Sequence, residues 1–334
     1  MYRMPAEWEP HEATWISWPK DPLTFPGEVL PKVERIYVEM IHALAKGEKV
    51  HLLVDDEEAE ARALDLVGEH GPKRNLITHK IPTVDVWFRD YGPIFVKNGK
   101  MKMTKWIFNA WGGKYEELMK DNGVVDSMAP LLGMEIERPG IILEGGSIDV
   151  NGKGTLLTTE QCLLNRNRNK GLSKAQIEKK LMDHLGITKI IWLKEGIEGD
   201  DTDGHIDDIA RFVDARTVLC ATEAGKSDPN HAILRKNLDD LKKARDQDGE
   251  PLLVKELPMP GPVHSPERRL PASYANFYIG NAAVLLPVFN HANDAKAISV
   301  LEEHFHGRKV VPIYCEPLVW GNGAIHCVTQ QQPR

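Results

Sequence analysis

The chain has 334 residues, of which 42% are hydrophobic and 27% are charged, a composition typical of a globular protein rather than a disordered one. Its formal net charge of −7 argues against non-specific nucleic-acid binding, which needs a basic face, and favours small cationic partners. There is no run of about 18 apolar residues, no signal-peptide core and only four cysteines, so we expect no transmembrane helix and a reducing, cytoplasmic location.

Amphipathic stretches of helical length alternate with short β-rich runs, and each such pair precedes a glycine-bounded strand pair. We expect helices at 28–46, 115–132, 173–185, 229–245 and 293–306. We expect strands at 12–19, 49–54, 83–96, 134–137, 140–150, 154–159, 187–193, 204–213, 217–222, 251–257, 273–289, 308–314 and 321–331. No segment looks like a linker, so we expect one α/β domain over residues 1–334.

The strand pairs of the five rounds carry unusual polar residues. Taking Asp90, Glu144, His205, Asn276 and Cys327 as markers, the intervals range from 51 to 71 residues. Five similar units that close around an axis would bring these polar strand ends to one centre. An ordinary α/β sandwich with coincidental spacing is the alternative.

The cysteines divide into one candidate nucleophile and three others. Cys327 lies in GNGAIHC, where the glycines allow the backbone to approach a ligand closely. Cys327 is either a buried structural residue or a nucleophile, whose thiolate form a bound cation would favour. Cys162 and Cys220 lie in apolar runs and fit a structural role, and Cys315 is undecided.

His205 and Asp207 are two positions apart, so on a strand both side chains would project from the same face. Three interpretations are open for this pair. It is a general acid/base histidine beside a substrate-binding carboxylate, part of a non-haem iron site, or an acidic turn with a solvated histidine.

Two further carboxylates stand at expected strand ends. Asp90 follows Arg89 in WFRDYGP, but neighbours on a strand point to opposite faces, so a buried Asp90 would need another cation such as a ligand. Glu144 ends the apolar run GIILE before two glycines, where a charged residue needs a dedicated partner. The alternatives are a turn-forming Asp90 and a solvated Glu144 on an edge strand.

Three carboxylates around a thiol would raise its pKa and weaken it as a nucleophile. The combination makes sense if the substrate is a guanidinium, which is planar, permanently charged and suited to bidentate binding by carboxylates. Two carboxylates would then hold the cation, the third would orient the histidine, and the bound charge would favour the cysteine thiolate.

The motifs PAEWEPHEATWISWP, WFRDYGP, FNAWGGKY, LEGGSID, TDGHIDD, SYANFYI and IHCVTQQQP resemble the agmatine deiminase and bacterial-type peptidyl-arginine deiminase family over nearly the whole chain. The resemblance implies the five-bladed α/β propeller of the guanidine-modifying pentein superfamily, as a single catalytic domain without metal or cofactor. It implies the following roles: nucleophile Cys327, general acid/base His205, guanidinium ligands Asp90 and Asp207, histidine partner Glu144, aromatic wall Trp87, and distal-amine candidate Asp201.

The implied enzyme is a hydrolase of linear amidines. It would convert agmatine to N-carbamoylputrescine and ammonia in putrescine and polyamine synthesis, through an amidino-cysteine intermediate. Deimination of peptidyl or free arginine to citrulline is the alternative, and amidino transfer, an H-x-D metal oxygenase and a non-catalytic guanidine-binding module are further ones. The resemblance also implies a homodimer. The chain departs from the family at Asp208, at Ala210-Arg211, within 321–327 and in the loop 261–270. All four places lie where the tail of the substrate would be recognised.

Overall fold

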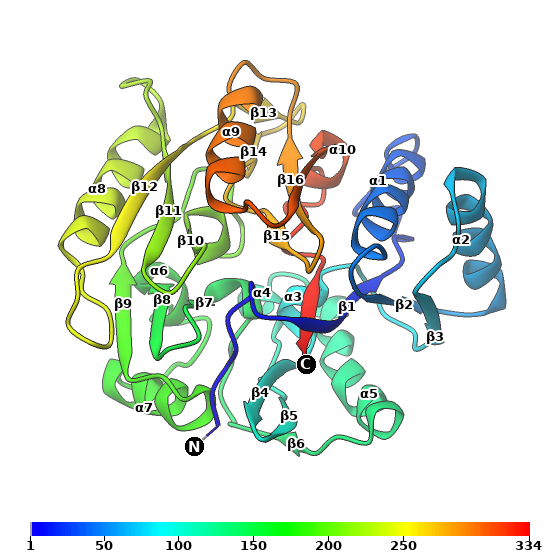
Figure 1. Ribbon diagram of the computed structural model, residues 1–334, viewed down its shortest axis with the longest axis horizontal. Coiled ribbons are helices and arrows are strands. Elements are labelled where there is room, and N and C mark those ends of the chain that lie inside the picture. The colour runs from blue at the N-terminus through cyan, green and yellow to red at the C-terminus, as the bar shows by residue number, and fades with distance from the viewer. Residues whose placement is uncertain (1) are drawn as a thin grey trace.

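The structure is a computed structural model that describes residues 2–334. Within this range the strands form five sheets of three or four strands and one separate two-stranded hairpin. Figure 1 shows the five sheets arranged around the middle of the molecule, with the long helices on the outside and α3 and α4 near the centre. No helix of the described residues is long and apolar enough to cross a membrane.

The first sheet joins the two ends of the chain. Its order is β18 (Gln330–Pro333), β1 (His11–Ser17), β2 (Lys49–Val54) and β3 (Leu76–Lys80), with α1 (Val29–Leu44) and α2 (Glu57–His70) in the crossovers. The strands β18 and β1 are antiparallel, and Trp15 Nε1 donates to Gln332 Oε1 at 2.8 Å across them. The C-terminal strand is thereby fixed immediately after the segment that carries Cys327.

The other four sheets repeat one pattern, an antiparallel pair followed by a parallel third strand. They are β4 (Ile94–Asn98), β5 (Lys100–Thr104), β6 (Ile136–Glu137); β7 (Asp149–Val150), β8 (Thr155–Thr159), β9 (Lys189–Leu193); β10 (Ala210–Phe212), β11 (Thr217–Thr222), β12 (Leu253–Pro258); and β15 (Tyr278–Ile279), β16 (Ala283–Val288), β17 (Lys309–Tyr314). The parallel step requires a crossover, and this crossover carries α5 (Val124–Leu132), α7 (Lys174–Leu185), α8 (Pro229–Lys243) and α9 (Asp294–His304) respectively.

Local signals explain where these helices begin and end. Ser173 and Gln176 form a capping box at the start of α7, and Gly186 ends that helix in the left-handed conformation. The side chain of Asp228 caps α8, whose first residue is Pro229. These helices lie where the sequence predicts them; the predicted helix 115–132 begins as the 3₁₀ helix η1 (Glu116–Gly123) before α5.

The remaining elements are short, and several correct the predicted strands. They are α3 (Phe88–Tyr91), α4 (Ala110–Gly113), α6 (Glu160–Leu163), α10 (Glu316–Val319), the 3₁₀ turns η2 (Gly145–Ser147) and η3 (Ile206–Asp208), and the hairpin strands β13 (Val263–His264) and β14 (Arg269–Leu270). The predicted strands 83–96, 140–150 and 204–213 each contain a helical turn instead, namely α3, η2 and η3, and the regular strand begins only after that turn. Helix α2 and strand β3 were not predicted.

Candidate active site

The structure contains a cavity of about 520 Å³, and Cys327 lies in its wall. The other lining residues that the sequence singles out are Trp87, Asp90 and Asp201. Asp90 belongs to α3, Asp207 belongs to η3, and Cys327 precedes β18. Three segments that are far apart in the sequence therefore bring a thiol and two carboxylates together.

Glycine is required where these turns meet. A Cβ atom on Gly146 would lie 2.6 Å from His205 Nδ1, 2.9 Å from Asp90 Oδ1 and 3.0 Å from Asp207 Oδ2. A Cβ atom on Gly145 would lie 2.2 Å from the carbonyl oxygen of Arg89. The glycine pair of LEGGS thus lets the histidine and both carboxylates approach the same small volume of space.

Asp90 is a buried carboxylate that receives only neutral donors. Its Oδ1 accepts from the backbone N–H of Gly146 and its Oδ2 from Trp111 Nε1, both at 2.9 Å. Burial, together with the charges of Asp207 and Glu144, raises its pKa well above the ordinary value.

As expected, Arg89 does not pair with Asp90. The expected reason was wrong, however, because the two residues lie on a helical turn and not on a strand. The Arg89 guanidinium instead donates to Gln331 Oε1 at 2.8 Å and to Glu7 Oε2 at 3.3 Å. Within residues 2–334, no lysine or arginine forms an ion pair with Asp90.

Cys327 lies between an amide and a carboxylate. Asn276 Nδ2 donates to its Sγ at 3.1 Å, and Asp207 Oδ2 lies 3.8 Å from the same sulfur. Burial raises the pKa of the thiol well above its ordinary value, and Asp207, Asp208 and Asp90 raise it further. Burial and the neighbouring carboxyl groups therefore favour the protonated thiol over the thiolate.

Asp207 differs from Asp90 because it has a strong donor. Burial alone would raise its pKa, but His326 Nδ1, 2.7 Å from Oδ2, holds the pKa of Asp207 below its ordinary value. Its other oxygen, Oδ1, is buried and has no hydrogen-bond partner. That oxygen is free to accept from a bound ligand.

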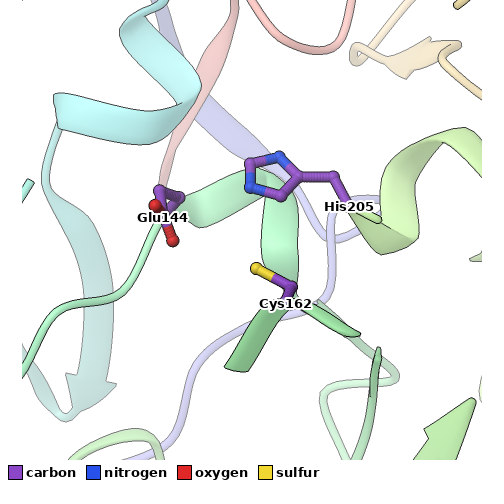
Figure 2. A group of neighbouring side chains, drawn as sticks. All are labelled: Glu144, Cys162 and His205. Carbon is purple, nitrogen blue, oxygen red and sulfur yellow. The ribbon is translucent and has the colours of Figure 1, made fainter. Parts of the chain in front are cut away.

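Glu144 and His205 lie close together, and Figure 2 shows the sulfur of Cys162 directed toward them. One ligand atom from each of these three side chains lies within 4.8 Å of the others. Glu144 Oε2 and His205 Nε2 are both buried without a hydrogen-bond partner. The expected pairing of glutamate with histidine is therefore a close approach and not a hydrogen bond.

Arg168 is the direct partner of Glu144, with its Nε 2.6 Å from Oε1. Burial lowers the pKa of His205 to about 3, so the imidazole is neutral in the free protein. Glu144, Cys162 and His205 are the one group in residues 2–334 with the donors for a metal ion. Arg168 already neutralises the glutamate, and burial raises the pKa of the Cys162 thiol, so both features oppose metal binding.

The two residues expected along the substrate chain also line the cavity. Trp87 donates through Nε1 to Asp85 Oδ2 at 2.9 Å, which fixes the indole in the wall. Asp201 Oδ2 accepts from Tyr115 Oη at 2.5 Å and from Asn322 Nδ2 at 3.0 Å. Asp201 therefore faces the cavity with neutral donors on its carboxylate.

Several supporting residues were not found by the sequence reasoning. Glu7, Trp111 and His326 were missed although they stand inside the motifs PAEWEPHE, FNAWGGKY and IHC, so a signal was present. Arg168 follows Cys162 in a polar run without any pattern of charge that marks it as buried. His326 contacts Asp207, as a distant histidine ligand of a non-haem iron site at His205 and Asp207 would. Both of its ring nitrogens are hydrogen-bonded to carboxylates, however, so neither is available to bind iron.

The sequence model of the Porphyromonas-type peptidyl-arginine deiminase family matches residues 3–333. An agmatine deiminase of Stutzerimonas stutzeri is 38% identical and aligns over 99% of this chain and 95% of its own length. Solved agmatine deiminases from Enterococcus faecalis and C. jejuni, the latter with substrate bound, are 31% and 34% identical, with TM-scores of 0.93 and 0.90. Both alignments cover 100% of this chain and 96% and 97% of the respective structures. The chain therefore belongs to the Porphyromonas-type peptidyl-arginine deiminase family.

Proposed function

We propose that the protein hydrolyses agmatine to N-carbamoylputrescine and ammonia, as a hydrolase of C–N bonds in linear amidines. The observation that carries the proposal is the thiol of Cys327 beside Asp90 and Asp207, two buried carboxylates with no lysine or arginine of residues 2–334 bonded to them. A guanidinium is the cation that matches two carboxylates geometrically. The similarity to agmatine deiminases over the full chain supports agmatine as the substrate.

In the proposed complex, Asp90 and the free Oδ1 of Asp207 accept hydrogen bonds from the guanidinium. The bound cation compensates for the burial that raises the pKa of Asp90, so this carboxyl gives up its proton on binding. The same cation lowers the pKa of the Cys327 thiol. Trp87 forms the wall beside the alkyl chain, and Asp201 is the proposed partner of the distal ammonium.

The first chemical step forms the amidino-cysteine. His205, neutral in the free protein, takes the thiol proton, and the Cys327 thiolate attacks the guanidinium carbon. The sulfur–carbon bond forms, His205 returns the proton to the departing nitrogen, and ammonia leaves as the carbon–nitrogen bond breaks.

The second step hydrolyses this intermediate. His205 removes a proton from water, the oxygen bonds to the amidino carbon, and the sulfur–carbon bond breaks. The hydroxyl proton of the tetrahedral intermediate is lost to solvent, so that the ureido product and the Cys327 thiolate remain. Reprotonation of the thiolate by His205 restores the resting enzyme.

The proposal extends to the fold and the setting of the enzyme. Four of the five large sheets share one strand pattern, and the first sheet contains the same pattern in β18, β1 and β2, with β3 added. This repetition supports a five-bladed α/β propeller that forms one catalytic domain. All four cysteines are free and buried, which supports a cytoplasmic location. The residues of the proposed mechanism perform each step without a metal or an organic cofactor.

The test is ammonia release by the purified protein without added metal. Agmatine, free arginine and a peptide with an internal arginine are compared, with Cys327→Ser as the control. Turnover of agmatine alone is expected. Turnover of the peptide would support the second candidate, peptidyl-arginine deimination, which the name of the matching family favours. Equal activity of Cys327→Ser would overturn the mechanism.

A further inference from the structure

The imidazole of His326 lies between two carboxylates. Its Nδ1 is 2.7 Å from Asp207 Oδ2, and its Nε2 is 2.8 Å from Glu7 Oε2. All three side chains are buried. An ionised carboxylate only accepts hydrogen bonds, so the imidazole can satisfy both neighbours only if both of its nitrogens carry hydrogen. That form of histidine is a cation.

The surroundings of Glu7 fix its charge and its position. Its Oε1 accepts from Arg211 Nη2 and from the backbone N–H of Ile279, each at 2.9 Å, and Arg89 Nη2 lies 3.3 Å from Oε2. The segment that carries Glu7 crosses the middle of the molecule on its way to β1 (Figure 1). Burial would raise the pKa of Glu7, but Arg211 and His326 hold it well below the ordinary value.

Charge balance leads to the same assignment. The connected buried network contains three carboxylates, Glu7, Asp149 and Asp207, and two guanidinium groups, Arg89 and Arg211. A protonated His326 brings this network to zero net charge. A neutral imidazole would leave one buried negative charge without compensation, which is costly in a protein interior.

We infer that Glu7 and His326 are positioning residues that keep Asp207 ionised and aim its free oxygen at the substrate guanidinium. This inference rests on the proposed function. His326 occupies Oδ2 of Asp207, so the unpartnered Oδ1 is the oxygen left for a ligand. Glu7 holds the imidazolium in place from the other side, and the two arginines hold Glu7.

The other titratable groups that influence Asp207 make this support necessary. The carboxyls of Asp90 and Asp208 and the thiol of Cys327 surround it, and His205 is neutral in the free protein. Asp90 and Asp208 have raised pKa values, so Asp207 is the carboxylate that presents a charge to the incoming substrate at neutral pH.

The direct test is the protonation state of His326 in the unliganded, full-length protein. With ¹⁵N-labelled histidine, NMR is expected to show both His326 nitrogens protonated at neutral pH, and the His326→Gln spectrum identifies the signal. Glu7→Gln keeps an acceptor oxygen but no charge, and it is measured at the same pH as the matched variant that removes only the charge of Glu7. A singly protonated His326 at neutral pH would overturn the inference whatever the enzyme acts on.

The second test measures agmatine binding to the turnover-free Cys327→Ser protein by calorimetry across pH. Adding His326→Gln removes a charge-assisted hydrogen bond and is expected to weaken binding about tenfold to a hundredfold at neutral pH. Because the pKa of Asp207 rises in this variant, the loss is expected to shrink as the pH increases. In the active enzyme, KM is expected to change more than kcat.

The outcomes separate the inference from the proposed function. An equal loss of affinity at every pH would mean a merely structural role and would contradict the inference, as would unchanged binding. If the parent Cys327→Ser protein binds no agmatine, the proposed substrate is wrong, and the NMR experiment still decides the charge of His326.

Discussion

Replacing Arg168 by methionine tests the ion pair that supports the proposed acid/base residue. The Arg168 side chain is fully buried and donates to Glu144 Oε1 at 2.6 Å, Asp203 Oδ2 at 2.7 Å and the carbonyl oxygen of Thr202 at 2.8 Å. Methionine keeps much of the buried volume but removes the charge. The Arg168→Met substitution therefore leaves Glu144 as a buried carboxylate without a counter-ion.

The expected loss of stability follows from this burial. Removing one partner of a buried ion pair costs about 3–5 kcal/mol, because the remaining charge is uncompensated. An unfolding entropy of about 2.1 cal/mol/K per residue gives about 0.7 kcal/mol/K for a chain of 334 residues. Arg168→Met should therefore unfold about 4–7 °C below the parent protein.

The assay is urea and thermal unfolding at pH 7, with Arg166→Met as the matched control. Arg166 is two positions away, exposed and without an ion pair in the described structure, so its replacement should stay within about 0.5 kcal/mol of the parent. Adding Glu144→Gln to Arg168→Met should recover part of the loss, because it removes the stranded charge. A destabilisation by Arg168→Met as small as that of the control would refute this reasoning.

Three further predictions concern the site. Trp111→Phe removes the donor to Asp90 Oδ2 and should raise KM for agmatine about tenfold, near 1.4 kcal/mol, in steady-state kinetics. An unchanged KM would argue against Asp90 as a substrate ligand. Gly146→Ala places a methyl group 2.6 Å from His205 Nδ1 and should abolish turnover, whereas Gly123→Ala, with nothing within 4 Å, should behave like the parent in the same assay. His205 has a folded pKa of about 3 against about 6.5 unfolded, so the unfolded chain binds the extra proton between these values and stability should fall as pH drops below about 6.5. Between pH 7 and pH 5, the urea midpoint should fall less for His205→Asn than for the parent protein. Equal falls in the two proteins would contradict a neutral, buried imidazole.

The sequence predicts the long helices well because their signals are local. The capping box of α7 and the proline after the Asp228 cap of α8 can be read from adjacent letters. Helix α2 was missed because only Ala63 and Val67 of its residues are buried, so it carries almost no apolar stripe.

The local conformation at the site could not be predicted in the same way. The apolar residues around Asp90, Glu144 and His205 suggest strands, but packing of the turns around Gly146 overrides that preference. Helical turns bring the polar side chains to the centre before each strand begins. The roles of the candidate residues stay predictions, while the strand-face argument for His205 and Asp207 was wrong, because Asp207 lies in a 3₁₀ turn that His205 precedes.

The supporting charges depend on contacts between distant parts of the chain. Glu7 meets His326 across 319 positions, and Arg211 meets Glu7 across 204. No spacing rule connects such residues in one sequence. Only the fold shows that the first segment of the chain contacts the last one.

The central claim is that Cys327 carries a covalent intermediate, and rapid quenching followed by mass spectrometry tests it most directly. During steady turnover of agmatine, the peptide that contains Cys327 should gain the mass of agmatine less ammonia. The adduct should disappear when the substrate is exhausted, and it should be absent from Cys327→Ser. Continuous ammonia release with no adduct on Cys327, or with the adduct on another residue, would contradict the mechanism.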